Sequence, residues 1–149
     1  PENFIQDQYT DLPWSPTLKV SDRYVIDIGG RNLEIVGIPG HSPDAIALLD
    51  SEDLYLWTGD SFYEGTICMF FPETDLASYS LSLEKLASLA PSLKRVLPAH
   101  NAPIAEPRRL VERRDAFAAI QEGATEGVPN DDGTSSYPAG SFSLRLADK

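Results

Sequence analysis

Residues 38–44 of this 149-residue chain are Ile38-Pro39-Gly40-His41-Ser42-Pro43-Asp44. They end an apolar run, Leu33–Ile38, that predicts a strand, and Pro39-Gly40 stops that strand just before the histidine. His41 is therefore expected at a strand end, where loops that carry functional side chains usually lie.

Two further polar side chains follow predicted strands in the same way. Asp60 comes after the run Leu54–Thr58 and the stop at Gly59, and His100 follows the short run Arg95–Leu97. His41 and His100 are the only two histidines of the chain. Because loops at the ends of adjacent strands share one rim of a sheet, we expect the three side chains to lie along that rim.

Imidazole, carboxylate and imidazole together form a ligand set that suits zinc and similar divalent ions. A carboxylate can also give one oxygen to each of two cations that lie about 3.5–4 Å apart. Each residue alone has a structural alternative, since a histidine in a turn is usually a surface or hydrogen-bonded residue and an aspartate after glycine usually caps a turn. The metal hypothesis depends on all three residues occurring in order on strand ends.

Hydrophobic patterns that are bounded by glycine, proline or a capping residue predict strands and helices around these loops. We expect strands at residues 23–28, 33–38, 45–49, 54–58, 95–97 and 141–146, the first two joined around Gly29-Gly30. Helices are expected from an N-cap at Asp75 to Pro91, and from Pro107 to Gly123. Residues 1–22, 62–72 and 124–140 are expected to be irregular. This order indicates one α/β domain over residues 1–149, with helices on one face of a sheet.

The net charge of −11 limits the partners of the chain. Residues 1–75 hold 14 acidic and 3 basic side chains, whereas residues 76–149 hold 9 of each. The negative electrostatic field of these acidic side chains repels nucleic acid, so nucleic-acid binding is disfavoured. No apolar run approaches the roughly 20 residues of a membrane span, and no signal peptide is visible. The single cysteine, Cys68, fits a reducing compartment, so a cytoplasmic location is expected.

The three loop motifs together resemble the later three ligand motifs of the metallo-β-lactamase superfamily. They are Pro39-Gly40-His41-Ser42-Pro43-Asp44, then Thr58-Gly59-Asp60, then Leu97-Pro98-Ala99-His100-Asn101. The resemblance runs from about Arg23 onward and implies half of an αββα sandwich, with one mostly covered β-sheet and two main helices. It also implies that His41 binds a first metal, that Asp60 bridges two metals and is catalytic, and that His100 binds the second. The implied cofactor is a pair of Zn²⁺ ions.

The activity that this resemblance implies is metal-dependent hydrolysis of a small molecule. Metal charge lowers the pKa of water from 15.7 toward about 7, and the hydroxide attacks an ester, thioester, lactam or phosphoester centre. Phe62, Tyr63, Phe70 and Phe71 are candidate walls of an apolar substrate pocket, with packing inside the fold as the alternative. The stretch from Gly59 through Phe71, together with His41-Ser42-Pro43-Asp44, most resembles branches of the family that act on thioesters or similar acyl substrates.

One part of the family pattern is absent. The first motif, His-x-His-x-Asp-His, has no counterpart because no histidine is left to supply it. Three ligands are too few for two ions, so we expect a partner, either an N-terminal half with that motif or a second copy bound through an exposed sheet face. The chain alone is then expected to bind zinc weakly and to be inactive. The alternative is a non-catalytic binding or assembly module that lost the first motif.

Two other features are expected to be structural. Arg108, Arg109, Arg113 and Arg114 cluster on the second predicted helix, where acidic neighbours make a solvated face the default interpretation. Cys68 lies between apolar residues and is expected to be an inert thiol. Neither a Gly-x-Ser-x-Gly elbow nor a glycine-rich phosphate loop occurs in the sequence.

Overall fold

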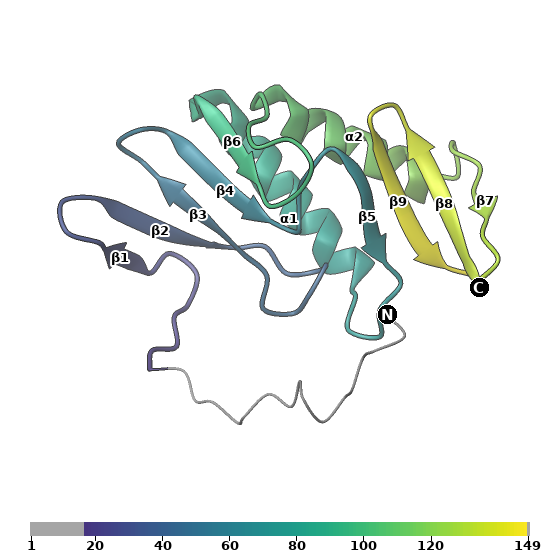
Figure 1. The fold of residues 1–149 in the computed structure, drawn as a ribbon, viewed down its shortest axis with the longest axis horizontal. Coiled ribbons are helices and arrows are strands. Elements are labelled where there is room, and N and C mark those ends of the chain that lie inside the picture. Colours follow the sequence, from purple (N-terminus) through teal and green to yellow (C-terminus); the bar gives the residue numbers. More distant parts are fainter. Residues whose placement is uncertain (1–16, 149) are drawn as a thin grey trace, which may run out of the picture.

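Two sheets and two main helices form the fold in the computed structural model, which describes residues 17–148 (Figure 1). The strands are β1 (Val25–Asp27), β2 (Asn32–Gly37), β3 (Ile46–Asp50), β4 (Tyr55–Gly59), β5 (Gly65–Met69), β6 (Arg95–Pro98), β7 (Val128–Pro129), β8 (Thr134–Ala139) and β9 (Phe142–Ala147). The helices are α1 (Leu76–Leu89), the 3-10 turn η2 (Ala90–Ser92) and α2 (Arg108–Gln121). Most of the lead-in predicted at residues 1–22 lies outside the described residues.

The first sheet has five strands in the order β1-β2-β3-β4-β6. β2, β3 and β4 pair antiparallel in succession, and β4 pairs parallel with β6. β2, β4 and β6 therefore run in the same direction and end at the same edge of the sheet. The loops that follow these three strands carry His41, Asp60 and His100.

A second sheet, in the order β5-β9-β8-β7, corrects two predictions. Residues 62–72 are predicted to be a loop but contain β5, which pairs parallel with β9. Residues 124–140 are likewise predicted to be a loop but contain β7 and β8, and β8 pairs antiparallel with β9. The α/β class with two helices is confirmed, whereas the single predicted sheet is replaced by two mixed sheets.

Both helices lie on one side of the sheets (Figure 1). α1 begins after Asp75, whose carboxylate accepts hydrogen bonds from the backbone N–H groups of Ala77 (2.9 Å) and Ser78 (3.1 Å), as the sequence predicts. The buried core joins side chains from both helices and both sheets, among them Leu56, Ile67, Leu83, Leu86, Leu110, Phe117 and Leu144. No helix within residues 17–148 is long and apolar enough to cross a membrane.

The five-stranded sheet has one covered face and one open face. Four side chains on the face toward the helices are at most 4% exposed, and they are Val36, Ala47, Leu56 and Val96. On the opposite face, Leu48, Trp57 and Leu97 stand side by side in the strand register. With Ile46, which is 42% exposed, they line a shallow apolar hollow of about 290 Å³. These four residues are called the open face below.

Candidate functional site

Asp60 and His100 meet at the shared edge of the first sheet. Because β4 and β6 are parallel neighbours, with Gly59 beside Pro98, the loops that follow them are adjacent. The Nε2 atom of His100 lies 2.9 Å from a carboxylate oxygen of Asp60, and the two side chains are 58% and 48% exposed. An imidazole and a carboxylate this close and this accessible can share a proton or bind the same cation.

His41 lies farther along the same edge, because β3 runs between β2 and β4. At about 4.8 Å per strand, its loop is roughly 10 Å from the loop of Asp60. His41 is half-buried, and its Nδ1 atom is buried without a hydrogen-bond partner among the described residues. Residues 17–148 contain no group of three or more His, Cys, Asp or Glu side chains arranged to hold a metal ion. The structure thus brings Asp60 and His100 together and leaves His41 apart from them.

Helix α1 fixes the loop after β2. Gly40 has a φ of +136°, and a Cβ atom at this position would overlap the backbone of Tyr79, so glycine is required. The Gly40 carbonyl accepts a hydrogen bond from the backbone N–H of Asp75 at 2.9 Å. The Pro39 carbonyl accepts another from the Ser82 hydroxyl at 2.6 Å. The loop is therefore attached to the first two turns of α1.

Tyr63 is the predicted pocket residue that lies beside the Asp60–His100 pair. Its ring packs edge-on against His100, with 5.1 Å between the ring centroids. Its hydroxyl donates to the Thr66 carbonyl at 2.8 Å. Burial raises the pKa of Tyr63 to about 12, so this hydroxyl stays protonated at neutral pH.

The other three predicted pocket residues lie elsewhere. Phe62 is fully buried and packs against Phe142 with 6.0 Å between ring centroids, so for Phe62 the packing alternative replaces the pocket. Phe70 and Phe71 follow the far end of β5, which separates them from Tyr63 by roughly 13–17 Å of extended chain. There they line a cavity of about 480 Å³, and none of the three candidate ligands contributes to its walls.

Two arginines of α2 are directed inward, which corrects the prediction of a solvated face for them. The Arg113 side chain is 1% exposed and that of Arg109 is 17% exposed, whereas the Arg108 side chain is 72% exposed. The buried positions of α2 are Leu110, Arg113, Phe117 and Ile120. Their spacing of three and four residues is the pattern of an inward face, so the sequence did contain a signal for Arg113.

The chain is similar in sequence and in fold to proteins of the metallo-β-lactamase superfamily. Over 87 residues it is 34% identical to the acyl-coenzyme A thioesterase MBLAC2 of Bos taurus, a match that covers 57% of this chain and 31% of the relative. It is also 30% identical over 144 residues to the lactamase-like protein nscB of Neosartorya fischeri, covering 91% of this chain and 42% of that protein.

A comparison of structures gives the same fold. A metallo-β-lactamase family protein from Thermus thermophilus superposes with a TM-score of 0.62 at 24% identity, over 75% of this chain and 38% of that chain. No protein-family model matches the sequence. The chain spans about a third of the length of the thioesterase relatives that it matches.

Proposed function

We propose that this chain supplies the later metal ligands of a metal-dependent hydrolase. The observation that carries the proposal is the contact of Asp60 with His100, 2.9 Å apart on the edge of the sheet that also bears His41. In this assignment His41 would hold a first Zn²⁺, Asp60 would be shared by two ions and His100 would hold the second. When bound, the ions would supply a hydroxide nucleophile at neutral pH.

The donor atoms of Asp60 and His100 fit this assignment, whereas His41, whose loop lies roughly 10 Å away, would have to move toward Asp60 to share an ion with it. Asp60 and His100 are accessible to an ion, and the imidazole of His41 has a buried ring nitrogen with no hydrogen bond from the described residues. Tyr63 covers one side of the His100 ring. Because the Tyr63 hydroxyl is protonated and donates to the Thr66 carbonyl, it would not compete for the cation.

The remaining ligands would come from a partner that packs on the open face. We assign them to an N-terminal half that carries a His-x-His-x-Asp-His motif. The hollow on the open face is lined partly by Gly59 and Ala99, each of which directly precedes a candidate ligand. A partner seated there would therefore lie beside Asp60 and His100. A second copy of this chain is the competing occupant of the same face.

The substrate class that we propose is a small-molecule ester or thioester. The support is the relationship to MBLAC2, which is named an acyl-coenzyme A thioesterase and of which this chain matches about a third. The assignment extends the resemblance of the stretch from Gly59 through Phe71 to thioester-cleaving branches of the family.

The test compares the chain alone with the chain joined to an N-terminal half that carries the missing motif. Alone, the chain is expected to bind Zn²⁺ weakly and to turn over no substrate. The joined protein is expected to hydrolyse members of a panel of acyl thioesters, lactones and phosphodiesters. Asp60→Asn should abolish this turnover, whereas Asp131→Asn, the same charge change at an exposed loop residue, should leave it unchanged.

Three outcomes count against the hydrolase. They are tight, stoichiometric zinc in the chain alone, undiminished turnover in the Asp60 variant, and a joined protein that assembles but hydrolyses nothing on the panel. The last of these would favour the non-catalytic assembly module.

A further inference from the structure

Two arginines on one side of α2 connect this helix to both loops of the candidate site. Arg109 and Arg113 are about one helical turn apart. Their guanidinium carbons lie 4.7 Å and 5.4 Å from the centroid of the Phe142 ring, so both guanidinium groups are held against the same aromatic side chain. From this common platform they extend in two directions.

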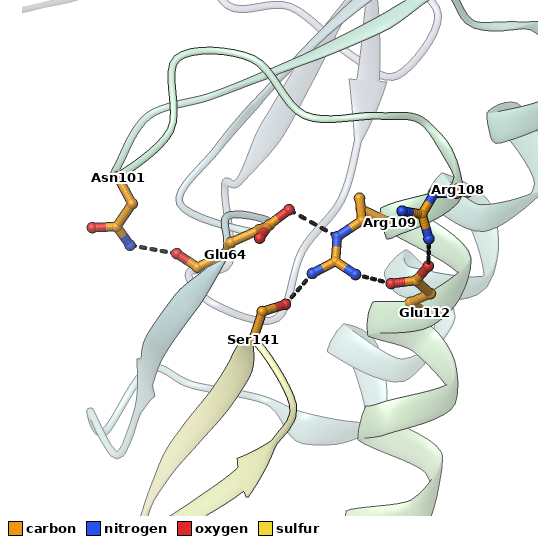
Figure 2. A network of polar contacts seen from close by, with 6 residues as sticks. All are labelled: Glu64, Asn101, Arg108, Arg109, Glu112 and Ser141. Carbon is orange, nitrogen blue, oxygen red and sulfur yellow. Dashed lines mark hydrogen bonds and ion pairs between the residues drawn. The ribbon is translucent and has the colours of Figure 1, made fainter.

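The Arg109 branch reaches the loop after β6 (Figure 2). Its Nε atom donates to the Glu64 carboxylate at 2.8 Å, and its terminal nitrogens donate to Glu112 and to the Ser141 hydroxyl. The backbone carbonyl of Glu64 accepts a hydrogen bond from the side-chain amide of Asn101. Asn101 has a φ of +65° and directly follows the second candidate histidine. Arg109 thus holds Glu64, and Glu64 holds the turn that carries the histidine.

The Arg113 branch reaches the loop after β4 through the core. The Nε atom of Arg113 lies 3.4 Å from the Tyr79 hydroxyl, and its Nη1 atom donates to the Ser143 carbonyl at 3.3 Å. The Tyr79 hydroxyl in turn donates to the carbonyl of Ser61 at 2.8 Å. Ser61 directly follows Asp60, and the whole Tyr79 side chain is buried, so water does not compete for this hydrogen bond.

We infer that Arg109 and Arg113 are positioning residues that set the placement of Asp60 relative to His100. Both candidate ligands are about half exposed and lie in loops, so their own packing does not fix them. Hydrogen bonds behind the ligands commonly orient them, and the loss of such bonds lowers metal affinity about 10–100-fold. The consequence for metal binding rests on the proposed function, but the positioning itself can be measured without metal.

The test of the first branch pairs Arg109→Lys with Arg108→Lys in the 149-residue chain. Lysine keeps the charge but cannot reproduce the three-way contact of the Arg109 guanidinium. Among residues 17–148, the only hydrogen-bond or ion-pair partner of the Arg108 side chain is Glu112. Without metal, the backbone amide NMR signals of His100 and Asn101 are expected to shift and broaden in R109K, because the turn that carries them loses its attachment to helix α2, and to stay unchanged in R108K. Glu64→Gln, which keeps an acceptor, should give a smaller change in the same signals.

The test of the second branch pairs Tyr79→Phe with Tyr24→Phe. The first change removes the hydroxyl that holds Ser61. The second removes the hydroxyl of a side chain that is 41% exposed and lies next to β1, at the edge of the sheet opposite β6. Hydrogen exchange at the amides of Ser61 and Phe62 should rise in Y79F alone.

Zinc titration, followed by the His100 imidazole signal, should show about 10–100-fold weaker binding in R109K than in R108K.

The outcomes separate this inference from the proposed function. Identical amide signals of His100 and Asn101 in R109K and R108K, or a uniform loss of stability with no local change around His100, overturn the inference. If the local change is present but the unsubstituted chain shows no zinc response at any concentration, the positioning role stands and the proposed metal function fails.

Discussion

The two faces of the five-stranded sheet use the same strands and the same alternation of side chains, yet they have different surroundings. Leu56 on β4 is fully buried against the helices, whereas Leu48 on the adjacent β3 points to the open face and is half-buried. Full burial of a leucine contributes about 1.5–3 kcal/mol, and Leu48, unlike Leu56, receives only part of it. Within residues 17–148, the helices complete one side of the sheet and leave the other available to a partner.

The largest expected effect is the loss of a side chain from the covered face. Leu56→Ala leaves a cavity in the core and should lower the free energy of unfolding by about 2–5 kcal/mol. Leu48→Ala, the matched change on the open face, should lower it by only about 1 kcal/mol in the chain alone. Urea unfolding of both variants measures the difference, and equal losses would contradict the contrast between the faces.

A smaller effect is expected at Asp50, a buried carboxylate on the same face as Leu48. Backbone N–H groups of Asp53 and Glu52 donate to it at 3.0 Å, and these hydrogen bonds lower its pKa below the usual 3.8. A carboxyl whose pKa is lowered by folding stabilises the fold above the unfolded pKa and loses that contribution as the pH falls through the folded pKa.

The stability difference between the unsubstituted chain and Asp50→Asn should therefore be full at neutral pH and shrink as the pH falls below about 4. Chemical unfolding at a series of pH values measures this difference. A difference that is the same at all pH values would show that the carboxylate charge has no part in closing the turn after β3.

The smallest effect on stability is expected from Ile46→Lys on the open face. Because Ile46 is 42% exposed, the free energy of unfolding should change by less than about 0.5 kcal/mol. If the open face binds a second copy, however, the added charge should shift the chain toward monomer in sedimentation velocity at high concentration. An unchanged distribution of species would argue against self-association through this face.

The local sequence pattern was sufficient to predict the elements that are bounded by turn or capping residues. The predicted strands at residues 45–49 and 54–58 match β3 and β4 to within one residue at each end, and the N-cap at Asp75 is confirmed. β5 escaped prediction because its residues do not alternate and its partner, β9, lies more than 70 residues later. β8 escaped because it contains Pro138, a residue that disfavours a strand. Proline is tolerated here because β7 pairs with β8 only at Ser135 and Ser136.

The candidate site could be predicted only in part, because the sequence shows where strands end but not the order in which they pair. Strand ends indicated where Asp60 and His100 would lie, but the sequence could not show that β3 runs between the loop of His41 and the other two. The pocket residues were assigned by nearness to Asp60 along the chain, and the length of β5 moved Phe70 and Phe71 away. The roles of Arg109 and Arg113 depend on contacts with distant residues, which charge patterning alone does not reveal.

The close approach of Gly40 to Tyr79 has a mechanical consequence. With no side chain between them and with hydrogen bonds on either side, the loop of His41 and the first turns of α1 have little freedom to slide past each other. A small tilt of α1 would therefore carry the imidazole with it, while the Tyr79 hydroxyl would transmit the same tilt to Ser61. Helix and loops should respond to a disturbance as one rigid body.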